Sequence, residues 1–157
     1  MKAVLLSVGK TDDPAYARMI DVYKKRLGFY IPFDMEFLPD IKNRKSVSEK
    51  EQKILEGESI LSRLQKGDHV VLLDENGKHY TSVEFSRFME VKSHSVSKRL
   101  VFVVGGPYGF SDPVYERANE MLSLSKMTFT HQMVRLVFVE QLYRAMTILN
   151  GEPYHHV

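Results

Sequence analysis

The sequence contains no cysteine, no run of 18 apolar residues and no strong excess of one charge. Without cysteine the chain can form neither a disulfide framework, nor a thiol nucleophile, nor a Cys-ligated zinc site, which fits a reducing compartment. Without a long apolar run we expect no membrane span, and the first ten residues lack the apolar length and cleavage site of a secretory signal. The 22 Lys and Arg residues against 20 Asp and Glu give a net charge of +2, far from the electrostatic footprint of a typical nucleic-acid binder. Charge alone therefore identifies no partner.

The composition that remains is typical of a globular protein. Hydrophobic residues make up 43% of the 157 residues and charged residues 27%, which argues against disorder, collagen-like repeats and coiled coil. This length is typical of one domain, so we predict a single domain over residues 1–157.

Short apolar runs alternate with helical patterns along the chain. Strands are predicted at residues 3–8, 33–38, 69–73 and 100–104, with a small apolar run at 121–124. Helices are predicted between them: from about Pro14 to Gly28, from the polar segment 39–53 to Leu64, after a cap at Ser82, at 113–120, and from about 131 to 150. A turn is predicted at residues 74–77. The alternation predicts an α/β fold with a largely parallel sheet.

A glycine-rich segment, Gly105-Gly106-Pro107-Tyr108-Gly109, follows the fourth predicted strand directly. Ligands of open α/β sheets bind at the carboxyl ends of strands, so this segment is a candidate binding loop. It matches neither the dinucleotide fingerprint nor the P-loop. A tight turn that needs unusual backbone angles explains the same glycines, and from the pattern alone that explanation is favoured.

The last predicted helix is apolar on several sides, which indicates burial beyond a single stripe. We expect deep insertion or a subunit interface, and predict a homodimer. Glu140 and Arg144 are spaced for a helical ion pair, which competes with a substrate role for Arg144. His131 and Arg135 lie at the amino end of this helix, where backbone N–H groups favour anions.

The chain ends with an aromatic residue and two imidazoles, Tyr154, His155 and His156, on a segment expected to be exposed and flexible. Zinc typically takes three or four protein ligands, and no carboxylate or cysteine stands at a supporting spacing, so we predict no metal site. Base stacking and phosphate contact suit these side chains better.

Several motifs together resemble one bacterial family, the ribosomal RNA large subunit methyltransferase H family. The resemblance spans the whole chain and is most specific in the carboxyl third. It is carried by Leu124-Ser125-Lys126-Met127-Thr128-Phe129, His131-Gln132-Met133-Val134-Arg135, Glu140-Gln141-Leu142-Tyr143-Arg144-Ala145 and Gly151-Glu152-Pro153-Tyr154-His155. The opening Val4-Leu5-Leu6-Ser7-Val8-Gly9-Lys10, Leu72-Leu73-Asp74 and Val104-Gly105-Gly106 agree with it.

The resemblance implies a SPOUT methyltransferase fold with a trefoil knot near the C-terminus, acting as a cytoplasmic homodimer. It further implies S-adenosylmethionine as methyl donor, without a metal, and N3 of a pseudouridine in 23S rRNA of assembled ribosomes as acceptor, with neither membrane nor DNA as partner. The family's cofactor positions fall on Leu73, Gly105, Gly106, Ser125, Lys126, Met127, Thr128, Phe129 and Thr130.

The acceptor nitrogen loses a proton as it attacks the methyl group, so we expect a general base nearby. His155 is the first candidate, because an imidazole exchanges protons near neutral pH. Arg144 is expected to hold a phosphate or polarise a base carbonyl, and Tyr154 to stack on the target. The family more often has Pro at the position of Thr130 and Lys or Arg at that of His156.

Two other functions compete with this reading. A non-catalytic module that binds RNA or ribosomes would keep the fold and transfer no methyl group. A small nucleotide-binding protein would use the glycine segment for phosphate, but it would lack the Lys and Ser/Thr of a P-loop.

Overall fold

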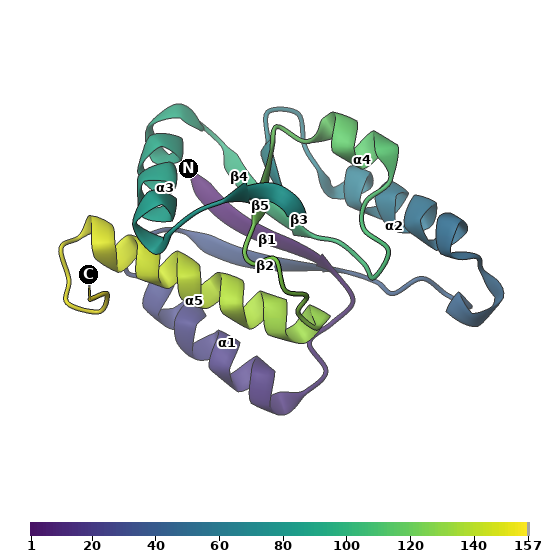
Figure 1. The fold of residues 1–157 in the computed structure, drawn as a ribbon, viewed down its shortest axis with the longest axis horizontal. Coiled ribbons are helices and arrows are strands. Elements are labelled where there is room, and N and C mark those ends of the chain that lie inside the picture. Colours follow the sequence, from purple (N-terminus) through teal and green to yellow (C-terminus); the bar gives the residue numbers. More distant parts are fainter. Residues whose placement is uncertain (157) are drawn as a thin grey trace.

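The computed structural model describes residues 1–156, and Val157, the last residue of the predicted domain, lies outside them. Five strands and five α-helices alternate along the chain, with one short 3₁₀ turn (Figure 1). The strands are β1 (Lys2–Val8), β2 (Phe33–Leu38), β3 (His69–His79), β4 (Arg99–Val104) and β5 (Glu120–Ser123). The helices are α1 (Pro14–Leu27), α2 (Glu49–Arg63), α3 (Ser82–Ser95), α4 (Asp112–Arg117) and α5 (His131–Leu149), and the 3₁₀ turn η1 is Arg44–Ser46.

All five strands are parallel and form one sheet in the order β2-β1-β4-β3-β5. The two central strands are almost entirely apolar because both of their faces are covered, as is typical of parallel sheets. Their carboxyl ends meet at one edge of the sheet, where β1 is followed by Gly9 and β4 by Gly105. The predicted parallel α/β class is confirmed.

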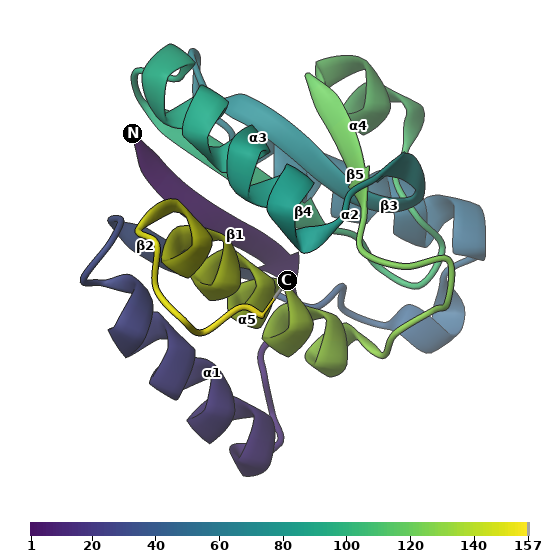
Figure 2. The ribbon, with the colours of Figure 1, turned by 60° about the vertical axis from the view of Figure 1, so that its left-hand side comes forward.

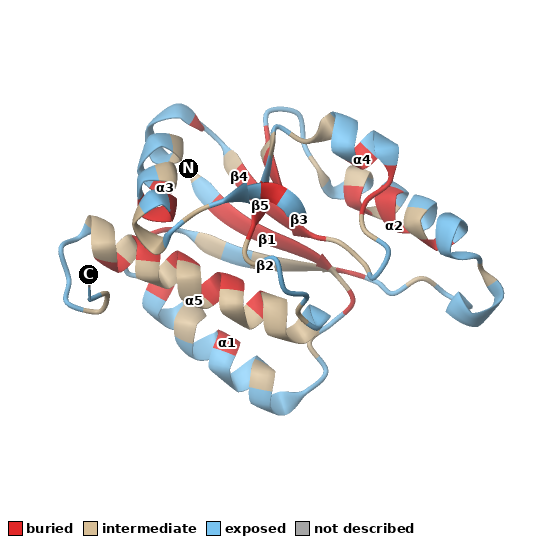
Figure 3. Ribbon diagram, viewed as in Figure 1, coloured by how far each residue is buried: buried red, intermediate tan, exposed pale blue. Residues whose placement is uncertain are grey.

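Two helical layers cover the sheet, as Figures 1 and 2 show. Side chains of alternating direction on β1 divide the core: Leu5 packs in the cluster under α1, α3 and α5, whereas Leu6 packs in the cluster under α2 and α4. Helix α5 lies between α1 and α3, and its Phe138 contacts Phe102 of β4 with ring centroids 4.7 Å apart. Figure 3 shows this buried interior between the layers.

Caps fix where the helices begin. Ser48 and Glu51 form a capping box at α2, and Thr81 with Glu84 forms another at α3. The predicted cap at Ser82 is thus wrong by one residue, since the hydroxyl of Thr81 accepts the Glu84 amide. Thr130 caps α5 by accepting the Met133 amide at 3.2 Å, so this departure from the family pattern still supplies a defined helix start.

Strand β3 is longer than predicted, and the predicted turn at residues 74–77 is wrong. The strand continues to His79 and pairs with β5 at residues 71–73 and again at Lys78 and His79, with a register shift between Leu73 and Lys78. Turn-forming residues here make a bulge inside a strand, because β5 supplies pairing partners that no local pattern announces. Gly77 lies against the β5 backbone at this point.

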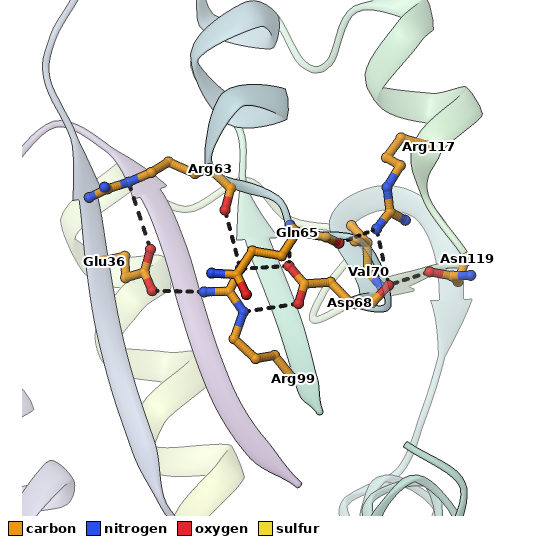
Figure 4. Close-up of polar contacts among 8 residues, drawn as sticks. All are labelled: Glu36, Arg63, Gln65, Asp68, Val70, Arg99, Arg117 and Asn119. Atoms are coloured by element: carbon orange, nitrogen blue, oxygen red, sulfur yellow. Dashed lines mark hydrogen bonds and ion pairs between the residues drawn. The ribbon is translucent and has the colours of Figure 1, made fainter. Parts of the chain in front are cut away.

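A polar network closes the opposite edge of the sheet, where β3 and β4 begin (Figure 4). The guanidinium of Arg99 donates to both oxygens of Asp68, at 2.9 and 2.6 Å, and to Glu36 at 3.1 Å. Burial acts to raise the pKa of Asp68, but Arg99 and the Gln65 amide outweigh it and hold that pKa below its ordinary value. The network ties the ends of α2, α4 and three strands together.

In the described part of the chain, no helix is both long enough and apolar enough to cross a bilayer.

Candidate functional site

A cavity of about 880 Å³ opens at the carboxyl ends of the strands. Its size is within the usual range for small-molecule sites, and its position is where parallel α/β sheets bind ligands. The residues around it come from the ends of β1 and β4, the segments that follow β1, β2, β4 and β5, the middle of β3, helices α2 and α4, and the first turn of α5.

Eight of the nine residues predicted to hold a cofactor line this one cavity, although they come from three separate segments. They are Leu73, Gly105, Gly106, Ser125, Met127, Thr128, Phe129 and Thr130. Lys126, the ninth, is exposed and does not line the cavity. Every residue from 124 to 131 except Lys126 therefore lines the cavity.

The glycine segment both turns and permits close approach. Gly109 has φ +80° and donates its amide to the carbonyl of Gly106 at 3.2 Å, which closes a tight turn. Gly106 has a different reason to be glycine, because a Cβ there would lie 2.0 Å from Oε2 of Glu56. The turn explanation and the binding-loop explanation thus apply to different glycines of one segment.

Several charged residues on the cavity were not among the predicted site residues. Asp74 accepts a 2.5 Å hydrogen bond from the hydroxyl of Tyr115, and burial together with this carboxylate raises the pKa of Tyr115 to about 12. Glu56 of α2 is only 4% exposed, and burial raises its pKa. A carboxylate on a helix rich in polar residues resembles a solvated side chain, so no sequence pattern indicates that Glu56 is buried. Lys10, Asp12, Asp40, Arg44 and Glu75 also line the cavity.

Arg135 does not face this cavity with the anion-binding role suggested by its place near the start of α5. It is completely buried and donates to the carbonyls of Val8 at 2.7 Å and Gly9 at 2.9 Å and to the Thr11 hydroxyl at 3.1 Å. The guanidinium therefore holds the segment after β1 in place. Only His131 of the predicted pair lines the cavity.

The three residues predicted to be catalytic meet at the other end of α5. Arg144 donates to Glu140 at 2.6 Å and approaches Nδ1 of His155 at 3.2 Å, with its guanidinium 4.8 Å from the centre of the Tyr154 ring. The Tyr154 hydroxyl donates to Glu140 at 3.0 Å. The predicted helical ion pair is confirmed, and the same arginine also contacts both tail residues.

The tail is packed rather than free, so the expectation of an exposed, flexible end is wrong for Tyr154 and His155. Both are half-buried, whereas His156 is exposed. The ring of Tyr154 meets that of Tyr143 edge to face at 4.8 Å between centroids, and Glu152 accepts a 2.7 Å hydrogen bond from Tyr30. That carboxylate is the main cause that raises the pKa of Tyr30 to about 12. An aromatic contact with α5 and hydrogen bonds with Tyr23 of α1 and with Tyr30 thus hold the tail.

Two candidate clusters therefore lie far apart in one chain. The cavity includes Thr130, His131 and Val134 at the start of α5, whereas Arg144 belongs to its last turns. Arg144 follows Thr130 by 14 residues, a rise of about 21 Å at 1.5 Å per residue. The two clusters of one chain therefore lie at opposite ends of α5.

Comparisons with known proteins agree with the geometry. A family model described as "Predicted SPOUT methyltransferase" matches residues 1–155. The chain is 63% identical over 156 residues to the protein named "Ribosomal RNA large subunit methyltransferase H" of Parabacteroides distasonis, covering 99% of both chains. Proteins of the same name from Bacteroides thetaiotaomicron and Flavobacterium johnsoniae are 59% and 57% identical over the same length, again with 99% of each chain covered.

Proposed function

The chain belongs to the SPOUT methyltransferase family, and from this premise we propose that it transfers a methyl group from S-adenosylmethionine to N3 of a pseudouridine in 23S rRNA, on assembled ribosomes in the cytoplasm. The names of its relatives support the rRNA substrate. The observation that carries the proposal is the cavity at the carboxyl edge of the sheet, on which the middle of β3 and the segments after β4 and β5 converge. We infer one catalytic domain that uses neither DNA nor a membrane as partner.

The cavity fits an adenosyl cofactor in size and in lining. Its volume of about 880 Å³ suits a ligand of that class, and Gly106 leaves room for close approach of the loop. Leu73, Gly105, Gly106, Ser125 and residues 127–130 would hold the cofactor, while Lys126 would face outward. When bound, S-adenosylmethionine supplies a methyl group already activated on a sulfonium, so the chemistry needs no metal. The contribution of the protein is then mostly orientation, which is worth about 7–11 kcal/mol of barrier in favourable cases.

The tail cluster supplies groups suited to the RNA. An arginine only donates hydrogen bonds, so its contact with Nδ1 of His155 requires a lone pair there and places the imidazole proton on Nε2. We propose that Arg144 turns from His155 to a phosphate or base carbonyl of the substrate, which frees Nδ1 to take the N3 proton. Tyr154, held by Glu140, would stack on the target or position it.

A homodimer would bring the two clusters together. In an antiparallel pairing across α5, the tail of one subunit would lie beside the cavity of its partner, because the clusters occupy opposite ends of that helix. Partly exposed apolar residues on α5, including Met133 and Val137, supply the surface, and α1 exposes Met19 next to it. Each active site would then be built from both subunits.

The decisive experiment measures the transfer of a labelled methyl group from S-adenosylmethionine to three substrates. These are 70S ribosomes, free 23S rRNA, and ribosomes that have an unmodified uridine at the target position. We expect transfer to pseudouridine-containing ribosomes and little to the other two. Binding of ribosomes without any transfer would instead support the non-catalytic module, and binding of ATP in place of S-adenosylmethionine would support the nucleotide-binding protein.

The shared active site is tested by mixing two inactive variants. Thr128→Trp fills the cavity from an exposed position, and Arg144→Ala removes the guanidinium of the tail cluster. Each homodimer should be inactive, whereas randomly mixed subunits should recover about one quarter of wild-type activity, because half of the dimers carry one intact site out of two. No recovery, with dimers shown to form, contradicts the shared site.

The role of His155 is tested separately with His155→Ala. We expect turnover at saturating substrate to fall and to lose its dependence on pH near neutrality, because the group that takes the proton is gone. His156→Ala, which changes the neighbouring exposed imidazole, is the matched control. Unchanged turnover in His155→Ala across pH would remove the general-base assignment.

A further inference from the structure

Glu56 is a buried carboxylate that the proposed chemistry has not used. It is 4% exposed, and its Oε1 accepts a 2.9 Å hydrogen bond from Gln52, which is itself 5% exposed. Within residues 1–156 its other oxygen, Oε2, has no hydrogen-bond partner, although Glu56 lines the cavity. A buried acceptor without a partner is costly and rare in folded proteins. It therefore calls for a partner that the chain itself does not supply.

The backbone around Glu56 is shaped to keep the carboxylate in place. Gly106 has no Cβ where one would fall 2.0 Å from Oε2, so the glycine loop leaves the space that this oxygen occupies. Gly57, the residue after Glu56, lets α2 approach Ser111, because a Cβ at Gly57 would lie 2.2 Å from the Oγ of Ser111. Gly57 of α2 and Gly106 of the glycine-rich segment thus allow these two parts of the chain to lie close together. The fold therefore holds this carboxylate in the wall of the cavity, beneath the glycine segment.

The neighbouring charges indicate what would pair with it. Asp40 has Arg44 within 3.8 Å, and Asp74 has the Tyr115 hydroxyl, so these two cavity carboxylates already have partners in the chain. Carboxylates outnumber cations among the residues that line the cavity. An acidic lining with one buried, unpartnered acceptor favours a ligand that brings positive charge. S-Adenosylmethionine carries two such groups, the sulfonium and the α-ammonium.

We propose that Glu56 is a cofactor-binding residue whose carboxylate pairs with a cationic group of the methyl donor. This inference rests on the proposed function, because it takes that donor as the occupant of the cavity. It assigns Glu56 to binding and not to proton transfer. The glycine at position 106 would then be needed for this carboxylate as much as for the ligand.

The test compares three ligands on the full-length protein and Glu56→Gln by calorimetry. The glutamine keeps the shape and the oxygen to which Gln52 donates, while the charge is lost and an NH2 group replaces Oε2. S-Adenosylmethionine should bind about 10- to 100-fold more weakly to the variant, as expected for a lost charge-assisted pair. The affinity for 5′-methylthioadenosine, which has the adenosine part without either cation, should differ between the variant and the wild type by less than about 3-fold. Glu58→Gln, an exposed position on the same helix, is the matched control and should leave all values unchanged.

S-Adenosylhomocysteine, which has the ammonium but no sulfonium, identifies the partner group. If Glu56→Gln weakens the binding of S-adenosylhomocysteine as much as that of S-adenosylmethionine, the ammonium is the group that pairs with Glu56. If the affinity for S-adenosylhomocysteine is unchanged, the sulfonium is that group. Both results support the proposal. Equal weakening of methylthioadenosine, or no weakening of any ligand, overturns it. If the wild type binds none of the three ligands, the proposed function itself fails, which is a distinguishable result.

Thermal unfolding without ligand separates a binding role from a structural one. Burial raises the pKa of Glu56, so its ionised form at neutral pH works against folding. Glu56→Gln should therefore melt at or above the wild-type temperature while it binds the cofactor less well. A lower melting temperature together with equal losses for all three ligands would show that Glu56 only supports the loop.

Discussion

Gly77→Ala should destabilise the protein through steric overlap alone. Gly77 lies in the second half of β3, where a Cβ would be 2.6 Å from the amide nitrogen of Leu122 and 2.7 Å from backbone carbons of Leu122 and Met121. Ordinary contacts of a Cβ begin at 3.4 Å, so the new atom would be about 0.7–0.8 Å too close. The obstacle is backbone, which no rotamer change can move away. Gly77 does not have a positive φ, so conformational strain is not part of the expected effect.

The expected loss follows from overpacking a site that cannot relax locally. Insertion of a methyl group into packed structure typically costs about 1–3 kcal/mol, and 1 kcal/mol shifts the melting temperature of a domain of this size by about 2–4 °C. Differential scanning calorimetry should therefore show a melting temperature roughly 2–12 °C below the wild type. Because β5 leads into residues 125–130 of the cavity, its displacement should also weaken cofactor binding more than the melting temperature alone suggests.

Gly28→Ala is the matched control for this prediction. Gly28 ends α1 with helical angles, φ −57° and ψ −20°, and its nearest contact is a carbonyl of its own helix at 3.3 Å. Alanine fits such a backbone and should be neutral or stabilise by about 0.4–1 kcal/mol through the unfolded state. If Gly77→Ala melts within 1 °C of the wild type, the close packing of β3 against β5 is not as described, and the steric argument fails.

Three further perturbations test other parts of the molecule. Asp68→Asn leaves the Arg99 guanidinium without its main partner and should cost about 3 kcal/mol in urea unfolding at pH 7. The pKa of Asp68 is lowered in the folded protein, so its contribution to stability is present above the ordinary pKa of an aspartate and is lost as the pH falls through the lower folded value. The free energy of unfolding of the variant should therefore fall less steeply at acid pH than that of the wild type. An equally steep fall contradicts this prediction. Arg135→Met leaves the carbonyls of Val8 and Gly9 without their donor and should lower the free energy of unfolding by about 3 kcal/mol. It should also weaken the binding of S-adenosylmethionine in the cavity. Unchanged binding with an intact fold would show that the segment after β1 keeps its shape without Arg135. Tyr115→Phe should remove from the absorbance titration a tyrosine whose pKa is raised to about 12, and the stabilisation that goes with this raised pKa, present below pH 10, should fade in the wild type as the pH rises toward 12. Loss of a tyrosine that ionises near its ordinary pKa of 10 would contradict the Asp74 contact.

Periodicity predicted the bounds of the elements well where these depend on the element's own residues. Strand β2 has the predicted bounds, β1 and β4 differ from the prediction by one residue, and α5 begins and ends within one residue of it. The failure at β3 has a physical reason: residues 74–77 have turn chemistry, but β5, more than 40 residues later, offers backbone partners that extend the strand. A strand end set by a distant neighbour leaves no trace in its own sequence.

The candidate site was predictable to the extent that chemistry follows strand ends. Residues 73–76, which the sequence places at a strand end, and the segments after β4 and β5 converge because the parallel strands run toward one edge, so a shared cavity follows from the topology. Glu56 could not be found this way, because it belongs to a helix whose polar residues look solvated. The glycine at position 106, which is 50 residues later, leaves the space that the buried carboxylate occupies. Arg135 misled for the converse reason: a charged residue near a helix start suggested a ligand, but it binds backbone carbonyls inside the fold.

The low net charge bears on how so small a protein would recognise a ribosome. Affinity for naked RNA depends chiefly on neutralised phosphates, and a chain with net charge +2 offers few cations in excess. In the tail cluster, the charge of Arg144 is already balanced by Glu140 at 2.6 Å, so contact with a phosphate replaces a partner that Arg144 already has. Such an exchange adds little affinity, but it requires the phosphate to arrive at a defined place. Selectivity would then come from the fit of a dimer to assembled rRNA, with Arg144 and His155 responding only when that fit is complete.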